Sequence, residues 1–239
     1  MNSKFYFAGI CSTQFNIQVE KCPEFFAAPQ RIETIQVPGM HGDLLPLENK
    51  TYSNVPQKYE IWFKAATEGV TAFSKQLAKW LLSPTGYQIL EDDYDPEIYR
   101  KAIFKGPLNI HNWMLERGRA VIEFDCKPQR FLKSGNQEIQ ILSGQSLHNP
   151  YMPSSPLIQI TGNGAGTLTI GDVTITVLRM SESLTFDCEI SNAYKGTSNE
   201  NNNIQLSTTN PIKLQSGETK ISYSGGITGV SIIPRWWTL

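Results

Sequence analysis

Apolar and polar residues alternate along much of the first half of the chain, which is the pattern of half-buried β-strands. This alternation predicts strands at 15–19, 31–37, 58–63, 86–91, 98–104, 108–115 and 119–126. One segment has a different period. Between residues 68 and 82, apolar residues recur every three or four positions and predict a helix with one apolar face, made of Val70, Phe73, Leu77, Trp80 and Leu81. Because such a face must pack on a sheet, an α+β domain is expected.

The last part of the chain has no helical periodicity. It predicts short strands at 157–161, 167–170, 173–178, 184–190, 204–206, 212–214, 220–223 and 230–234. Many short strands with turn residues between them favour a β-sandwich. The residues expected to point inward are Leu168, Ile170, Val173, Ile175, Val177, Leu184, Phe186, Cys188 and Ile190.

A change in amino-acid composition between the two parts predicts the domain boundary. Residues 127–156 hold four prolines and many Ser, Gly and Asn residues. We therefore expect an N-terminal α+β domain over 1–132 and a linker over 133–156 with a possible strand at 138–142. A C-terminal sandwich is expected over 157–239, which makes the protein mainly β.

Charge and hydropathy exclude several classes of protein. The 239 residues carry a formal net charge of -1, so no basic field is present to hold nucleic acid through its phosphates. No stretch approaches the roughly 20 apolar residues that span a bilayer, and no membrane insertion is expected. The four cysteines are scattered without a C-x-x-C pair and are interpreted as free thiols.

No pattern of catalytic or metal-binding residues emerges. The acidic run 91–97 lacks the glycine and the final glutamate of a calcium loop and is interpreted as a hairpin turn. The glycine-rich segment 162–166 precedes a strand rather than a helix, so it is interpreted as a turn and not a phosphate cradle. His41 neighbours Asp43, but no nucleophile motif accompanies them. We expect no enzymatic activity, no metal and no cofactor.

Two adjacent tryptophans near the C-terminus are the other candidates for ligand contact. Flat aromatic faces stack on sugar rings, so Trp236 and Trp237 could contact a glycan or a protein. Packing in a core or an interface is the alternative role for both. Because neighbours in a strand face opposite ways, one of the two is expected to point inward.

Several landmarks, taken in order, resemble one protein family over the whole chain. They are Val37–Leu44 (VPGMHGDL), the helix ending in Trp80-Leu81-Leu82, Leu90–Tyr94, Phe124–Pro128, Asn149-Pro150, Ser155–Gly164, Leu214–Glu218, Tyr223–Gly226 and Ile233–Leu239. In this order they resemble the distal tail proteins of long-tailed phages that infect Gram-positive hosts. One departure is His41, where the family loop often carries a basic or polar residue.

The resemblance implies an architecture and a set of partners. The N-terminal domain would form a homohexameric ring at the distal end of the tail, and the C-terminal domain would be a galectin-like sandwich. The ring would join the major tail tube protein to a tail-associated fibre or lysin-like protein, with a receptor-binding protein as a further partner. DNA would pass through the lumen without specific binding. The protein would be made in the host cytoplasm and reside in the tail tip of the virion.

The turn-rich loop 38–57 is the expected contact surface of such a ring or of the tube. It carries residues that are unusual in a loop exposed only to water, namely Met40, His41, Leu44, Leu45, Leu47 and Tyr52. A different hypothesis is a carbohydrate-binding module that attaches the virion to host cell-wall glycans. A glycosidase is the least supported hypothesis. Its paired carboxylates would have to lie in one cleft, whereas the acidic run 91–97 is expected on a hairpin of the helix-containing domain, away from the sandwich.

Overall fold

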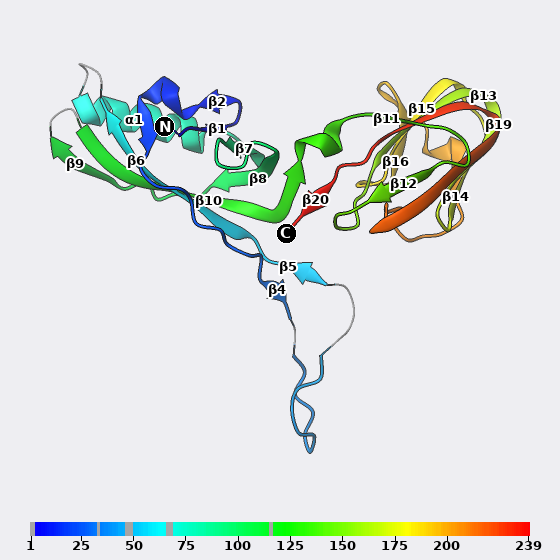
Figure 1. The fold of residues 1–239 in the computed structure, drawn as a ribbon, viewed down its shortest axis with the longest axis horizontal. Helices are drawn as coiled ribbons and strands as arrows, with labels where there is room; N and C mark the ends of the chain where they lie inside the picture. The colour runs from blue at the N-terminus through cyan, green and yellow to red at the C-terminus, as the bar shows by residue number, and fades with distance from the viewer. Residues whose placement is uncertain (1–2, 33, 46–49, 66–68, 115–116) are drawn as a thin grey trace. The chain divides into compact units, whose positions relative to one another are not determined.

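The computed structural model describes residues 3–32, 34–45, 50–65, 69–114 and 117–239. The chain forms two compact units, Met1–Arg130 together with Leu239, and Phe131–Thr238. Strands dominate both units, as the sequence predicts, and Figure 1 shows the one α-helix of the described residues in the first unit.

The first unit is an antiparallel sheet that holds α1 against one face. Its strands are β1 (Phe5–Phe7), β2 (Ile10–Cys11), β3 (Ile17–Val19), β6 (Val55–Lys64), β7 (Gln88–Asp92), β8 (Ile98–Phe104), β9 (Ile110–Met114) and β10 (Arg117–Leu132). They follow the order β2-β1-β7-β8-β10-β6-β3, and β9 pairs with β10. A short 3-10 helix, Ser12–Phe15, precedes β3. The backbone of β10 pairs with that of β6 from Arg117↔Lys64 to Cys126↔Val55.

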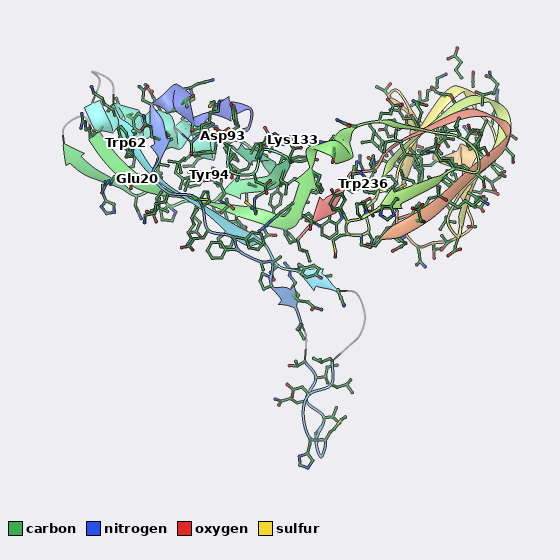
Figure 2. All side chains as sticks on the ribbon, viewed as in Figure 1. Glu20, Trp62, Asp93, Tyr94, Lys133 and Trp236 are labelled. Atoms are coloured by element: carbon green, nitrogen blue, oxygen red, sulfur yellow. The ribbon has the colours of Figure 1, made fainter. Side chains whose placement is uncertain are left out.

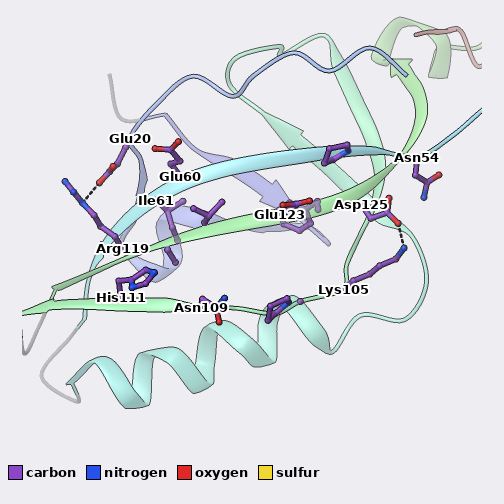
Figure 3. Close-up of a pocket in the computed structure, with 16 residues that line it drawn as sticks. Glu20, Asn54, Glu60, Ile61, Lys105, Asn109, His111, Arg119, Glu123 and Asp125 are labelled. Atoms are coloured by element: carbon purple, nitrogen blue, oxygen red, sulfur yellow. Dashed lines mark ion pairs between the residues drawn. The ribbon is translucent and has the colours of Figure 1, made fainter. Parts of the chain in front are cut away.

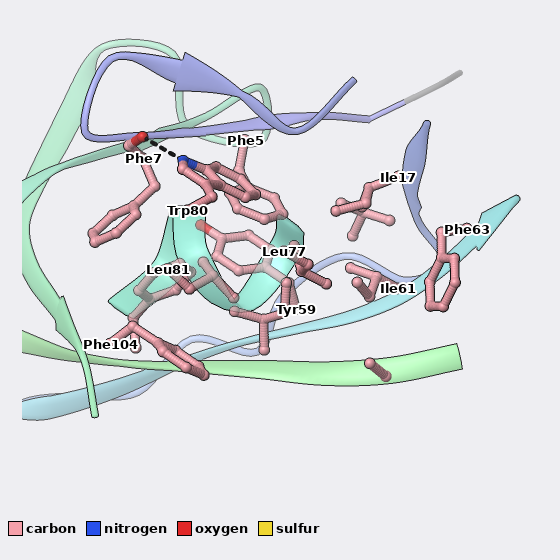
Figure 4. Close-up of a cluster of buried hydrophobic side chains, with 14 of the residues drawn as sticks. Phe5, Phe7, Ile17, Tyr59, Ile61, Phe63, Leu77, Trp80, Leu81 and Phe104 are labelled. Carbon is pink, nitrogen blue, oxygen red and sulfur yellow. Dashed lines mark hydrogen bonds between the residues drawn. The ribbon is translucent and has the colours of Figure 1, made fainter. Parts of the chain in front are cut away.

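The predicted helix is confirmed as α1 (Gly69–Leu82), and all five residues of its apolar face are buried. The face meets an aromatic cluster on the sheet (Figure 4). Phe5 stacks on Tyr59 with ring centroids 4.5 Å apart, and the Trp80 indole N–H donates to the Phe7 carbonyl at 3.2 Å. Because that donor is buried, the hydrogen bond removes a desolvation cost and fixes the helix on β1.

The strand expected at 31–37 is wrong beyond its first residue. Only β4 (Gln30–Arg31) forms, paired with β5 (Thr51–Tyr52), and a single bridge joins Ile35 to Leu44 further out. Alternation alone predicts a strand, but this segment has no core on which to bury its apolar side. The ladder therefore stops after two residue pairs.

The second unit is a sandwich built on two long strands. Its strands are β11 (Ile139–Ile141), β12 (Ser146–Asn149), β13 (Leu157–Ile170), β14 (Val173–Val177), β15 (Ser181–Asp187), β16 (Asn192–Lys195), β17 (Ser198–Asn199), β18 (Ile204–Leu206) and β19 (Gly217–Ile233). β20 (Trp237–Thr238) follows them in the chain and is not part of their sheet. One sheet order is β11-β19-β13-β15-β16-β17, with β12 on β19 and with β14 between β13 and β18. The strands expected at 157–161 and 167–170 are one strand, β13, and those at 220–223 and 230–234 are one strand, β19.

Glycines explain why these long strands are continuous. The segment 162–166, expected to be a turn, is an irregular part of β13 where its register against β19 shifts. A Cβ at Gly162 would lie 2.0 Å from the Gly226 carbonyl oxygen, and a Cβ at Gly226 would lie 2.0 Å from the Asn163 carbonyl oxygen. The two backbones can approach this closely only because both positions lack a side chain.

The segment 133–156 contributes strands to the second unit, although the sequence suggests a linker. It holds a 3-10 helix (Lys133–Asn136) and the strands β11 and β12, both of which pair with β19. Their main-chain hydrogen bonds make the segment part of the sheet. The single strand expected at 138–142 corresponds to β11.

Most of the expected inward residues of the sandwich are buried, with two exceptions. Val173 is partly buried, and Ile190 is 66% exposed. The prediction for Ile190 is wrong because β15 ends at Asp187, so Ile190 lies in the turn that follows.

Candidate functional site

The first candidate surface is the segment between β3 and β6, here called the arm (residues 29–45). Every described residue of the arm is exposed. Together with Phe25 beside it, the arm exposes an unusual set of large apolar side chains, namely Phe25, Ile32, Ile35, Val37, Met40, Leu44 and Leu45. Exposed apolar groups this close together mark interaction sites rather than a surface meant for water.

The predicted contact residues fall into three groups. Met40 and His41 lie at the tip, where the Met40 N–H donates to the Val37 carbonyl at 3.1 Å. Leu44 forms the bridge to Ile35 and Leu45 follows it. Tyr52 lies in β5 at the root and is half-buried, and Leu47 lies outside the described residues.

An open pocket of about 450 Å³ lies at the tip. Its lining comes from Gln36, Val37, Pro38, Met40, Gly42 and Asp43. The arm is held by two residue pairs and one bridge, and an isolated two-stranded ribbon of this length is at best marginally stable in water. The described residues of the arm therefore have no core of this unit that covers their apolar side chains.

A buried arginine anchors the root of the arm. Arg130 of β10 is 5% exposed, and its Nη2 donates to the Phe26 carbonyl at 2.8 Å. Its guanidinium carbon lies 3.6 Å from the centroid of the Phe25 ring, a cation–π contact. Burial, and secondly the charge of Arg100, lowers the pKa of Arg130 to about 10. Sequence reasoning missed this residue, because its partners lie more than 100 positions away and no local pattern marks them.

The second candidate surface is a groove of about 910 Å³ in the first unit (Figure 3). Its walls come from β6, β10 and the segment that leads into β9, and His111 and Asn109 lie along one side. Glu60 and Glu123 alternate with buried neighbours on their strands, so they belong to the sheet face opposite α1.

Ion pairs neutralise most of the charge in and around this groove. Arg119 binds Glu20 and Lys21 binds Glu60, each at 2.8 Å, while Lys58 binds Glu123 at 3.3 Å. Lys105 pairs with Asp125 in the same way. Exposed pairs of this kind add little stability, but they leave the groove without a strong field of either sign.

The two tryptophans differ in environment, as the alternation predicts. Trp236, labelled in Figure 2, is 7% exposed. It packs in the core of the second unit beside Tyr151, with ring centroids 6.3 Å apart. Trp237 is half-buried, and its indole N–H donates to the Pro153 carbonyl at 3.0 Å. Trp236 is thus a packing residue, and only one part of Trp237 remains open to a ligand.

The other sequence candidates form structural contacts. The acidic run makes the β7–β8 turn, in which Asp92 Oδ1 accepts from the N–H groups of Tyr94 and Asp95, and Asp92 Oδ2 accepts from buried Tyr59 at 2.6 Å. Among the described residues, no three His, Cys, Asp or Glu side chains lie together as metal ligands would. Within the same residues, no helix is long and apolar enough to cross a membrane.

The fold of both units, taken in order, is similar to that of solved phage hub and baseplate proteins. The chain superposes on the Dit protein (gp 19.1) of phage SPP1, described as a paradigm of the hub adsorption apparatus in phages that infect Gram-positive bacteria. The TM-score is 0.76 at 9% identity, over 96% of this chain and 97% of that protein.

Weaker likenesses extend to phage P2. Two chains of its baseplate in the activated conformation, one with Sr and one with Ca, give TM-scores of 0.51 and 0.53 at 10% and 9% identity. These matches cover 96% and 97% of this chain, and 96% and 98% of the respective baseplate chains. By sequence, no family model and no curated protein matches. The likeness is therefore one of fold.

Proposed function

We propose that this protein is a structural hub component of a phage or prophage tail, joining the tail tube to the tail-tip or baseplate apparatus that adsorbs to the host. The observation that carries the proposal is the likeness to the SPP1 hub protein over nearly the whole length of both chains. A likeness confined to one unit would fit many unrelated functions, since single β-folds are widely reused. A likeness that covers both units in the same order restricts the number of functions that fit the fold.

The hub would be a closed ring of six copies. A closed ring uses a head-to-tail contact, in which two different surfaces of each copy meet their counterparts on the neighbours. The arm suits one of these surfaces because its apolar side chains are exposed in the single chain. The self-neutralised groove suits a polar partner surface, since each of its carboxylates already has a cation nearby.

The partners follow from the position of such a ring. One face would dock the major tail tube protein and the other a tail-associated fibre or lysin-like protein, while the sandwich would offer an attachment point for a receptor-binding protein. DNA would pass through the lumen at ejection, and the net charge of -1 suits passage without retention. The role is structural rather than enzymatic, and its place is the tail tip of the virion.

Imaging and mass measurement test the ring. Purified protein, alone and mixed with tail tube protein, is examined by negative-stain microscopy and by light scattering on a sizing column. We expect rings with sixfold symmetry and a mass six times the 26.8 kDa of one chain. A monomer under both conditions would contradict the proposed hub.

A further inference from the structure

The second unit holds a small pocket that the hub function does not use. It lies between the β14–β15 turn, β15, β16 and the segment before β18, and has a volume of about 310 Å³. Its lining comes from three stretches of the chain, namely residues 179–184, Lys195, and the segment with Glu200 and Asn203.

Apolar and polar groups are divided within this pocket. Met180 and Leu184 are 6% and 2% exposed and belong to the core of the unit, so they form a closed floor. The other six lining residues are polar or charged and are exposed or half-buried. An apolar floor with a few converging polar groups is the usual composition of a small-ligand site.

The polar wall is held in place before any ligand arrives. Lys195 Nζ donates to the Ser181 carbonyl at 2.8 Å and to Glu182 Oε2 at 3.0 Å. Glu182 itself has a left-handed backbone with φ of 65°, and its N–H donates to Asn163 Oδ1 at 3.0 Å. A non-glycine residue in this conformation carries backbone strain, and such residues are concentrated at functional sites.

Several groups of the pocket remain available to a ligand. Within the described part of the chain, the Arg179 guanidinium and the hydroxyls of Ser181 and Ser183 have no hydrogen-bond partner. Glu200 Oε2 accepts from the Asn203 side chain at 2.5 Å, which orients that carboxylate. The pocket therefore offers hydroxyls that donate or accept, an oriented acceptor and one cation without a counter-ion.

We propose that this pocket binds a single sugar residue of a host-surface glycan, with Arg179 facing an anionic substituent of that sugar. The volume is at the low end of the range for ligand sites and suits one ring rather than a chain of rings. Vicinal hydroxyls of a sugar match the mixed donors and acceptors, and a planar guanidinium matches a carboxylate or a phosphate. The inference rests on the proposed function, since a tail tip meets the host surface.

The test uses the full-length protein and four soluble probes. Saturation-transfer NMR is recorded with glucose, N-acetylglucosamine, glucuronic acid and glucose 1-phosphate at millimolar concentrations. We expect binding of the two anionic sugars. The ratio of the affinities for glucuronic acid and glucose 1-phosphate shows whether the preferred substituent is a carboxylate or a phosphate. Arg179→Ala should weaken both about tenfold, the loss of one charged hydrogen bond.

Two further variants separate the pocket from the rest of the surface. Ser181→Trp places a bulky ring at an exposed position of the rim and should abolish binding while the thermal melt is unchanged. Lys220→Ala removes an exposed cation on β19 and should leave binding unchanged. Absence of a signal with all four probes, or normal binding by Ser181→Trp, would overturn the proposal that this pocket binds a sugar. Light scattering of the same samples measures ring formation separately. Failure of the proposed hub function can therefore be distinguished from failure of the proposed sugar site.

Discussion

Replacing Leu44 and Leu45 of the arm with aspartate is expected to dissociate the proposed ring. Both side chains are about half exposed in the single chain, at 44% and 53%. In a ring they would lose the remaining contact with water, and each copy would supply the same pair to its neighbour. The double variant should therefore weaken every contact of the ring equally.

The size of the effect follows from the area that each leucine still exposes. Complete burial of a leucine side chain contributes about 2 kcal/mol, so the exposed half contributes about 1 kcal/mol. The two leucines then account for about 2 kcal/mol per contact, a factor of about 30 in the association constant. Aspartate adds the cost of desolvating two carboxylates, so this is the minimum loss.

Light scattering on a sizing column, over a range of protein concentrations, measures the loss. We expect the wild type at six times the 26.8 kDa monomer mass and the double variant as monomer at concentrations where the wild type is still a ring. Leu142→Asp is the matched control, because Leu142 is 75% exposed on the β11–β12 turn of the other unit. If the double variant keeps the ring while its melting temperature is unchanged, the arm is not the contact surface.

Three predictions concern stability. Tyr59→Phe should lower the free energy of unfolding by about 2 kcal/mol in denaturant titrations, because the buried hydroxyl donates to the Asp92 carboxylate. Arg235 lies in ion-pair contact with Asp187 and holds the pKa of that carboxyl below its usual value. The stability that this pair contributes is therefore present above the ordinary Asp pKa and is lost as the pH falls through the lowered one, so Asp187→Asn should flatten this acid limb. Gly226→Ala should cost about 3 kcal/mol in thermal melts, because its Cβ would meet a β13 carbonyl oxygen at 2.0 Å.

Matched variants show whether these effects are specific. Tyr94→Phe alters an exposed tyrosine and should change stability by less than about 0.5 kcal/mol. Asp172→Asn, in an exposed turn, should leave the acid limb as it is. Gly196→Ala is strained by a φ of +59° but meets no atom within 4 Å, so its cost should stay near 1 kcal/mol. A Gly226→Ala variant no less stable than Gly196→Ala would refute the close backbone approach.

The sequence pattern was sufficient to predict those elements whose structure depends on residues close together in the chain. The helical stripe predicts α1 to within one residue, and its five apolar residues are all buried. The turn between β7 and β8 was also predictable, since Pro96 and the acidic residues before it favour a turn over a continued strand. In both cases the deciding interactions lie within a few residues.

Features that depend on distant partners could not be predicted in this way. The glycines of 162–166 suggest a turn until Gly225 and Gly226 are placed against them, more than 50 positions further along the chain. Arg130 looks like an ordinary strand residue, and its contact with Phe25 and Phe26 exists only after folding. The pocket at Arg179 is formed by three stretches within residues 179–203, and no local pattern marks it.

The arm differs from both cases. Its apolar residues are exposed, but their role as a contact surface stays a prediction, and the strand assigned at 31–37 was wrong. Alternation measures which side of a segment is apolar, but only a core or a partner determines whether that side is buried. The exposed apolar residues of the arm are thus predictable as a surface, and their final conformation depends on what covers them.

The pairing of β19 determines when the second unit can form during synthesis. β11, β12 and β13 all pair with β19, which begins at Gly217 near the end of the chain. These strands emerge from the ribosome well before their partner, whereas the first unit needs almost nothing beyond Arg130. Because domains fold as units in order of emergence, the first unit can fold during translation. The sandwich must wait with unpaired strand edges until β19 has emerged, and it is the part of the protein most exposed to aggregation during synthesis.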